Sequence, residues 1–468
     1  MSAAAERGAT MVGSNSRIST SCADGLQAAI SGRVAVPECE LYDKGRRLWN
    51  RAVHRRPAII AFCKQPEDVQ AAVRAARRHG LPLSVRGGGH DWAGRGLCDG
   101  GLVIDLTGMR DVAVDPRARV ATVAGGALAK DVAIAAVADN LVAALGNCGT
   151  VGMAGLTLGG GYGPLSGSCG LAADNLLGAE IVLADGRRVI TGPDVEPELF
   201  WALRGGGGNF GVVTSLSVRL HAAHHMLAGT IIYNWNEADT VLRRYAEFAA
   251  TVPDELGVPV GMMSGPDGEP CIMIVPLWNG EQCRGDRLMG EVQAFGIPQS
   301  AQFGRATYAD MLAQFDAWVA AAEGCHWEIR TRWLPALTAG ALDAIIAAMS
   351  RRASSYCSVF WHHFHGAATR MSPDVAAFGL RREHFMVEII AGWKPDGDDG
   401  TTHRRWAHDL WQSLAPFALP GGYANLLGPD DREQAAEAYG DNAVRLGVLK
   451  RRFDPDEVFA SAIPLPEG

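Results

Sequence analysis

The sequence lacks the motifs that assign several common enzyme classes. It contains no Gly-Lys pair and no GxSxG pattern, which excludes a Walker A nucleotide-binding loop and a serine hydrolase with a nucleophile elbow. Its 10 cysteines form no CxxC pair, so neither a zinc site nor a thioredoxin-like motif is expected.

Long apolar runs and basic runs are also missing. No stretch of about 18 apolar residues could span a membrane, and the N-terminus, MSAAAERGATMVGSNSRIST, has no secretory apolar region. The net charge is −8, without Lys/Arg-rich runs beyond pairs such as Arg55-Arg56. This argues against nucleic acid as the main partner. We expect a cytoplasmic protein with reduced thiols; the sequence does not indicate its oligomeric state.

Glycine, in contrast, is abundant and unevenly distributed. The chain has 57 glycines in 468 residues, and 28 of them lie among the 126 residues 86–211. No Gly-X-Y period connects them, which excludes a collagen-like fibre. With 48% hydrophobic and 20% charged residues, the composition is that of a folded protein. The glycines therefore provide positive φ angles or allow a ligand to approach the backbone closely.

The pattern of apolar residues predicts two α+β units. The first starts as a β-α-β unit, with strands at 58–63 and 81–86 around a helix at 65–79, and has a long glycine loop at 145–163. After residue 222, one antiparallel sheet backed by helices is expected. Its strands are expected at 229–235, 271–278, 325–333, 357–365 and 384–393, its helices at 239–251, 306–319, 338–352 and 402–414, and a last helix in the tail 430–459.

One segment matches a dinucleotide fingerprint in the wrong context. Residues 206–211, GGGNFG, fit GxGxxG, but a helix is expected before them and a strand after them. A Rossmann turn runs from strand to helix, so this match is not a Rossmann site.

Four glycine-rich segments follow one another along the chain, at 86–92 (RGGGHDW), 146–163, 170–187 and 203–213. Consecutive glycines let backbone N–H groups converge on a diphosphate. With the tail AYGDNAVRLGVLKRRFDPDEVF, the chain resembles the FAD-dependent oxidoreductases of the vanillyl-alcohol oxidase type, in the berberine-bridge-enzyme-like branch. Residues 1–35 are rich in Ser, Ala and Gly, which predicts a loose segment at the start of the chain. The resemblance implies a PCMH-type FAD-binding domain at 36–222, a substrate domain at 223–419 and a C-terminal segment, 420–468, that returns to the FAD domain.

The same resemblance implies a flavin attached twice. His90 matches the histidine that bonds the flavin 8α-methyl, and Cys148 matches the cysteine that bonds C6; the alternatives are an ordinary loop histidine and a small buried thiol. The other residues expected to bind FAD are Arg86, Gly87, Gly88, Gly89, Asp91, Thr150, Val151, Gly152, Gly155, Gly160, Gly161, Asn175, Gly208, Asn209, Gly211, Val213 and Asn425.

Three residues are candidates for the catalytic step. Glu388 is the one carboxylate in the apolar strand 384–393, and because burying it unpaired is costly, it should face a cavity or a partner. Tyr423 matches the tyrosine that removes the substrate proton in related oxidases. If 423–425 is a strand, Tyr423 and Asn425 share a face. Tyr162 matches a phenol near the flavin that stabilises negative charge. The choice of Glu388 or Tyr423 as the base remains open.

The sequence departs from the family at two positions that line the substrate side in relatives. Trp92 and Leu426 stand where tyrosine is usual, which weakens any inference of substrate by analogy. The histidines at 362, 363 and 365 do not make a metal set, since only 363 and 365 share a strand face. Trp361 and His363 could face the substrate.

The resemblance implies an oxidase. Val151, at a position that gates O₂ in relatives, favours an oxidase over a dehydrogenase. We expect oxidation of an alcohol or amine carbon by hydride transfer to flavin N5, with O₂ reduced to H₂O₂. The substrate would be a sugar, an oligosaccharide or a secondary metabolite. The alternatives are a dehydrogenase with another electron acceptor and a flavin-binding protein without turnover.

Overall fold

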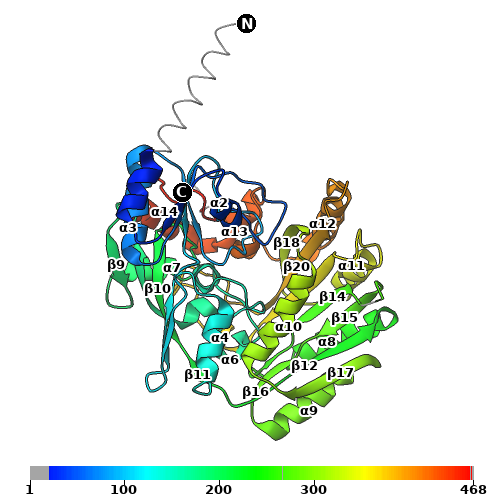
Figure 1. The fold of residues 1–468 in the computed structure, drawn as a ribbon. Coiled ribbons are helices and arrows are strands. Elements are labelled where there is room, and N and C mark those ends of the chain that lie inside the picture. The colour runs from blue at the N-terminus through cyan, green and yellow to red at the C-terminus, as the bar shows by residue number, and fades with distance from the viewer. Residues whose placement is uncertain (1–20, 266, 464, 466–468) are drawn as a thin grey trace.

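The structure is a computed structural model that describes residues 21–265, 267–463 and 465. It has an N-terminal half, residues 21–222, and a large-sheet half built on the strands between residues 225 and 393 (Figure 1). The mixed α/β architecture agrees with the predicted α+β class. No helix in the described part of the chain is long and apolar enough to cross a membrane.

The first sheet of the N-terminal half contains the predicted β-α-β unit. Helix α3 (Pro66–His79) has Pro66 in its first turn and ends at Gly80, whose φ is 61°. The sheet has the order β1-β2-β4-β3, and β4 pairs in parallel with β2 and with β3. Its elements are β1 (Arg33–Ala35), α2 (Glu40–Gly45), β2 (Ile59–Phe62), α3, β3 (Leu83–Arg86) and β4 (Leu102–Asp105).

The expectation of a loose segment at 1–35 is wrong for residues 21–35. Residues 21–29 are helical and β1 pairs with β2, because Cys22, Leu26 and Ile30 pack into the core of this sheet. Residues 1–20 lie outside the described residues.

The second sheet has the order β5-β6-β10-β8-β9. The predicted glycine loop at 145–163 is not all loop, since Met153, Leu158 and their neighbours form the helix α5 and pack into the core. Strands β7 (Leu141–Val142) and β11 (His221–Ala222) pair as a separate two-stranded sheet. The other elements of this region are β5 (Val112–Asp115), β6 (Val120–Ala124), α4 (Ala129–Val137), α5 (Met153–Leu158), α6 (Ser166–Cys169), η1 (Ala172–Asn175), β8 (Leu176–Val182), β9 (Arg188–Thr191), α7 (Pro197–Leu203) and β10 (Val212–Arg219).

The large sheet has nine strands in the order β13-β16-β12-β15-β14-β19-β20-β18, with β17 paired to β12. The segment expected as one strand at 271–278 is two strands, because Pro276 has no N–H to continue the ladder. The strands are β12 (His225–Asn234), β13 (Leu256–Gly257), β14 (Val260–Ser264), β15 (Pro270–Ile274), β16 (Leu277–Gly280), β17 (Pro298–Arg305), β18 (His326–Leu334), β19 (Ser358–Phe364) and β20 (His384–Trp393).

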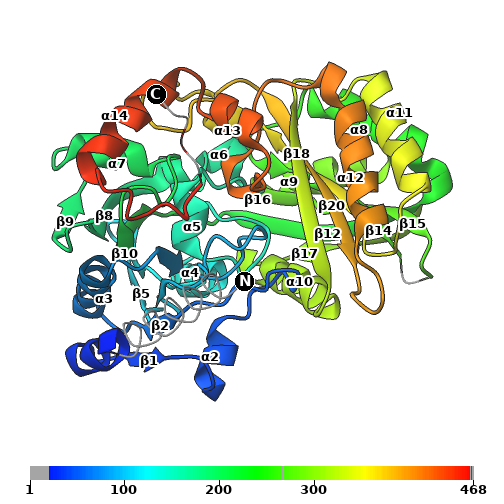
Figure 2. The same ribbon diagram turned by 90° about the horizontal axis from the view of Figure 1, so that it is seen from above.

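Helices cover one face of this sheet, and the other face turns toward the N-terminal half. Helices α8, α11 and α12 lie together on the outer face (Figure 2), over a core that includes Trp278, Trp361 and Trp393. Helix α10 contacts α4 of the N-terminal half. The helical elements are η2 (Trp235–Glu237), α8 (Ala238–Ala249), α9 (Gln282–Gln293), α10 (Tyr308–Ala321), α11 (Ala339–Ser350), η3 (Gly366–Thr369), α12 (Thr401–Ser413) and η4 (Ala415–Phe417).

The C-terminal segment returns to the N-terminal half. Helix α14 packs on α7, where Arg445 Nη2 lies 2.7 Å from Glu198 Oε1. The tail helix expected from residue 430 is two helices, divided at Gly440, whose φ of 48° ends regular helix. The elements are η5 (Ala424–Leu426), α13 (Arg432–Ala438), η6 (Gly440–Asn442) and α14 (Ala443–Phe453).

Candidate active site

The structure brings His90 and Cys148 together from two loops. His90 follows β3, and Cys148 precedes α5. The Cys148 Sγ lies 3.9 Å from the His90 Nε2. Both atoms contact the Thr150 hydroxyl, at 3.1 Å from the sulfur and 2.8 Å from the imidazole nitrogen. Two nucleophilic side chains 58 residues apart thus occupy one small site.

Burial keeps both groups neutral at neutral pH. It lowers the pKa of His90 to about 4, against a smaller opposing effect of the Asp316 carboxylate. Burial also raises the pKa of the Cys148 thiol to about 11. An uncharged imidazole has a lone pair available for bonding, whereas the thiol must lose its proton before it can react.

A stack of aromatic rings holds the imidazole in place. The ring of Trp49 lies 5.5 Å from that of His90, with an interplanar angle of 11°. Trp49 also stacks on Trp327 of β18 at 5.3 Å. Since Trp327 belongs to the large sheet, the site lies where the two halves of the molecule meet.

The loop before His90 provides free backbone donors. Within the described residues, the amides of Gly87, Gly88, Gly89 and His90 donate to no protein acceptor. A Cβ atom on Gly88 would lie 2.3 Å from the amide nitrogen of Gly152, so only glycine lets the two loops approach this closely. A row of unpartnered amides between closely packed glycine loops is the arrangement that suits a diphosphate, and the residues present therefore fit FAD.

Glu388 and His362 form a pair on the inward face of the large sheet. The His362 Nε2 lies 3.3 Å from the Glu388 Oε1, and the two side chains are only 11% and 17% exposed. Asn147, next to Cys148, places its Nδ2 3.5 Å from the same His362 nitrogen. The predicted attachment site and the predicted carboxylate are thereby linked through His362.

The expectation that Trp361 and His363 could face the substrate is wrong. Trp361 is fully buried beneath the covering helices, and His363 stacks on Phe385 on that side. His362 instead points inward, because successive side chains of β19 alternate between the faces.

Tyr423 is held by two donors to its phenol oxygen. The Gly161 amide and the Asn425 side-chain amide each donate to it at 3.0 Å. Burial raises the pKa of Tyr423 to about 12, with the charge of Glu388 adding to the effect, while the two donors oppose it. The expected strand at 423–425 is wrong, since residues 424–426 form η5. The two side chains meet nonetheless because the chain turns there.

Tyr162 contacts a buried histidine, and its expected place near the flavin stays a prediction. Its hydroxyl lies 2.7 Å from the His384 Nε2, and the His384 Nδ1 lies 2.8 Å from the carbonyl oxygen of Arg382. Since a carbonyl only accepts, Nδ1 carries the imidazole proton and Nε2 accepts the Tyr162 proton. Burial lowers the pKa of His384 to about 3, so it is neutral. The Tyr162 ring still packs edge-on against the ring of Tyr423 at 4.7 Å.

Several predicted FAD-binding side chains are engaged by the protein itself. Arg86 pairs with Asp105 at 3.0 Å, and Asp91 pairs with Arg95 at 2.9 Å. The amides of Asn175 and Asn209 donate to backbone carbonyls, which fixes the loops that carry them. Their contact with the flavin remains a prediction, as does that of the remaining loop residues: Val151, Gly155, Gly160, Gly208, Gly211 and Val213.

Three residues at the site were not predicted. Asp316 on α10 contacts Cys148, and nothing in the helical pattern around it marks it. His362 pairs with Glu388, and His384 with Tyr162. Alternation along 384–393 places His384 on the face of Glu388, so the strand pattern carried a signal for this residue.

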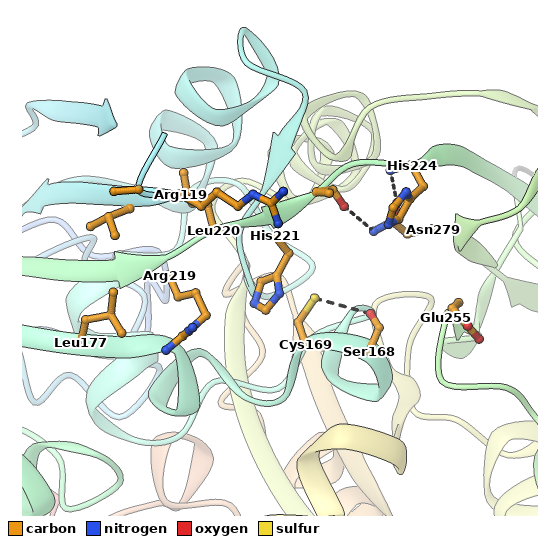
Figure 3. Close-up of a pocket in the computed structure, with 13 residues that line it drawn as sticks. Arg119, Ser168, Cys169, Leu177, Arg219, Leu220, His221, His224, Glu255 and Asn279 are labelled. Carbon is orange, nitrogen blue, oxygen red and sulfur yellow. Dashed lines mark hydrogen bonds between the residues drawn. The ribbon is translucent and has the colours of Figure 1, made fainter. Parts of the chain in front are cut away.

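A cavity of about 530 Å³ lies elsewhere, at another boundary of the two halves (Figure 3). Arg119, Arg219 and His221 line it from the N-terminal half, and Asn279 lines it from the large sheet. None of its 13 lining residues belongs to the predicted site.

The chain is similar to known FAD-linked proteins. The FAD binding domain family matches residues 57–192, and the berberine and berberine-like family matches residues 422–466. The FAD-linked oxidoreductase aurO of Gibberella zeae is 30% identical over 439 residues, which cover 91% of this chain and 85% of that protein. The chain belongs to the berberine-bridge-enzyme-like FAD-linked oxidoreductases.

Other members of the family are also similar along most of their length. (R)-6-hydroxynicotine oxidase of Paenarthrobacter nicotinovorans is 29% identical over 458 residues, covering 94% of this chain and 98% of that one. The structure of 6-hydroxy-D-nicotine oxidase from Arthrobacter nicotinovorans has a TM-score of 0.84 at 28% identity, covering 93% and 98%. A chitooligosaccharide oxidase shares the fold, with a TM-score of 0.84 at 23% identity, covering 96% and 100%. This berberine-bridge-enzyme-like protein is therefore an FAD-linked oxidoreductase with the PCMH-type fold.

Proposed function

We propose that this protein is an oxidase whose FAD is attached at both His90 and Cys148, and that it oxidises an alcohol or amine carbon of a small molecule. The observation that carries the proposal is the 3.9 Å approach of the Cys148 sulfur to the His90 imidazole, beside a row of free amides. The His90 Nε2 is engaged with Thr150, and its Nδ1 makes no hydrogen bond within the described residues, so Nδ1 is the nitrogen free to bond.

The flavin supplies the hydride acceptor, and O₂ reoxidises it to give H₂O₂. The protein must take the substrate proton. Tyr423 has a pKa near 12 and is protonated at neutral pH, so it needs an acceptor before it can act as a base. Glu388 is close enough for its charge to raise that pKa, and His362 orients its carboxylate. We assign Glu388 as the proton acceptor that Tyr423 needs. The two donors to the Tyr423 oxygen stabilise the phenolate that forms when its proton passes to Glu388.

A buried apolar cluster next to His90 favours an aromatic or alkaloid-like secondary metabolite over a sugar. Trp92, Trp327 and Ile390 form a buried apolar cluster beside the His90 stack, and Phe360 and Leu426 pack against it. Tryptophan and isoleucine side chains offer a sugar hydroxyl few partners, whereas flat apolar rings pack well on them. That a 29% identical relative is named a hydroxynicotine oxidase supports the same class.

The attachment is tested by precipitating the protein with acid. We expect the pellet to stay yellow, and a tryptic flavopeptide to contain both His90 and Cys148. The His90→Ala variant should keep only the flavin link at Cys148, and the Cys148→Ala variant only the link at His90. A colourless pellet from the wild-type protein would refute the double attachment.

The reaction is tested by measuring H₂O₂ release with a panel of sugars, phenols and cyclic amines. Peroxide formation from a phenol or amine, and not from sugars, is the expected result. Anaerobic bleaching of the flavin by a substrate, with electrons passing only to an artificial dye and not to O₂, would instead show a dehydrogenase. No bleaching by any compound would favour a flavin-binding protein without turnover.

A further inference from the structure

Asp316 reaches across from the large-sheet half to the loop that carries Cys148. It lies on α10, and its Oδ1 accepts hydrogen bonds from the amides of Gly149, at 2.8 Å, and Thr150, at 3.2 Å. The Cys148 thiol donates to the same oxygen at 3.4 Å. One carboxylate oxygen is therefore fixed beside the sulfur by two backbone donors.

This contact is a close and mostly buried one. The Asp316 side chain is 19% exposed, and Lys130 Nζ lies 3.9 Å from its Oδ2. A Cβ atom at position 149 would lie 2.7 Å from the Asp316 Oδ2, so glycine at 149 allows the carboxylate to approach. A carboxylate at this place disfavours the thiolate, and it adds to the burial that raises the pKa of Cys148 to about 11. Cys148 thus stays protonated until a neighbour takes its proton.

The other neighbours of the sulfur are poorer acceptors. The Thr150 hydroxyl is 3.1 Å away, but a hydroxyl is not a base at neutral pH. The His90 Nε2 is 3.9 Å away and already contacts Thr150.

We propose that Asp316 is the base that removes the Cys148 thiol proton when the sulfur bonds to C6 of the flavin, so that the chain catalyses its own modification at this position. The inference rests on the double attachment proposed above. It assigns a catalytic role in cofactor attachment to a residue from the opposite half of the molecule.

The step balances in atoms and electrons. The Cys148 S–H bond breaks and its proton passes to Asp316 Oδ1, while one S–C6 bond forms and the hydrogen on C6 leaves as a proton. The two electrons released stay on the flavin, which takes up two protons and is thereby reduced. O₂ then removes the two electrons and two protons as H₂O₂, which restores the oxidised flavin. The Asp316 carboxylate returns its proton to solvent.

Asp316→Asn is the direct test, because asparagine keeps an oxygen to accept from the Gly149 and Thr150 amides but is not a base. Each protein is freed of unlinked flavin, incubated with FAD in air, and sampled over time. Mass spectrometry of tryptic flavopeptides gives the fraction linked at Cys148 and, separately, at His90. We expect Cys148 linkage in the variant to be roughly 100-fold slower than in the wild type, with His90 linkage unchanged.

Controls separate a chemical role from a structural one. Asp310→Asn, on the same helix but capping Thr307, should link at the wild-type rate. Asp316→Glu should restore part of the rate. Linkage in Asp316→Asn should rise as the pH approaches 10, because hydroxide then removes the thiol proton; a purely structural defect would not recover with pH.

Two failures can be told apart. If the wild-type protein carries no Cys148 link, the double attachment is refuted, and this inference with it. If the wild type is linked and Asp316→Asn links at the same rate, only the role of Asp316 is refuted. An Asp316→Asn protein that loses both links at every pH, with Asp316→Glu no better, also refutes it, because a folding defect then explains the loss.

Discussion

The phenol of Tyr162 donates a hydrogen bond to His384 Nε2 at 2.7 Å, and both residues are buried. The two residues come from the glycine-rich loop after α5 and from the first position of β20, 222 residues apart. Their contact fixes the tautomer of the imidazole and the direction of the phenol, which packs against Tyr423.

The first prediction concerns stability at acid pH. Burial lowers the pKa of His384 from 6.5 to about 3, so below pH 6.5 the unfolded chain binds a proton that the folded protein does not. The stability that neutral His384 provides is complete above pH 6.5 and is lost as the pH falls toward 3, at about 1.4 kcal/mol per pH unit. Urea unfolding at several pH values should show a shallower decline for His384→Gln than for the wild type. His408→Gln, at an exposed position, should leave the slope unchanged.

The second prediction concerns the ion pair between Asp174 and Arg381. The two terminal guanidinium nitrogens of Arg381 each donate to one carboxylate oxygen of Asp174 at 2.8 Å. The Asp174 side chain is 5% exposed and the Arg381 side chain is 3% exposed. Removing one partner leaves the other buried and unpaired, so Asp174→Asn should lower the free energy of unfolding by about 3–5 kcal/mol. Asp185→Asn removes an exposed pair with Arg187 and should cost less than about 1 kcal/mol. Equal effects of the two substitutions in urea unfolding would contradict the prediction.

The third prediction concerns the role of Glu388 as the proton acceptor, with Glu383 as the control. Glu388→Gln removes the proton acceptor but keeps the shape of the side chain, so kcat/KM should fall by roughly 100-fold to 10,000-fold. Tyr423→Phe should have an effect of similar size, and the double variant should be little worse than either alone because the two act as one unit. Glu383→Gln, whose carboxylate pairs with His363 on the helix-covered side, should keep kcat/KM within a few-fold of the wild-type value. A fall in stability in place of a fall in kcat/KM would show that Glu388 is structural.

The fourth prediction compares two glycines of the proposed FAD cradle. Gly88→Ala places a methyl group 2.3 Å from the Gly152 amide nitrogen, which must push the two loops apart. We expect this variant to be purified without flavin and with a lower melting temperature. Gly155→Ala, within α5, meets nothing within 4 Å and should raise the free energy of unfolding by about 0.5–1 kcal/mol. Full flavin content in Gly88→Ala would refute the close approach of the loops.

Local patterns predicted many elements well. The strand at 384–393 has the predicted bounds, because it is an almost continuous apolar run. The helix expected at 65–79 extends over Pro66–His79, because Pro66 lies in its first turn and Gly80 ends it. Errors arose where competing effects decide the local structure. Pro276 divides one apolar run into two strands, and packing against the core folds part of the glycine loop into α5.

The sequence by itself determined the family, the FAD cofactor, the loops that carry His90 and Cys148, and the strand that carries Glu388, because those residues belong to motifs and patterns that can be read along the chain. Only the tertiary structure decided what surrounds them. Asp316 beside Cys148, His362 beside Glu388 and His384 beside Tyr162 are separated from their partners by 168, 26 and 222 residues. Such contacts follow from how the two halves dock and which strand face turns inward, and both are set by the packing of the whole chain, which no local spacing records.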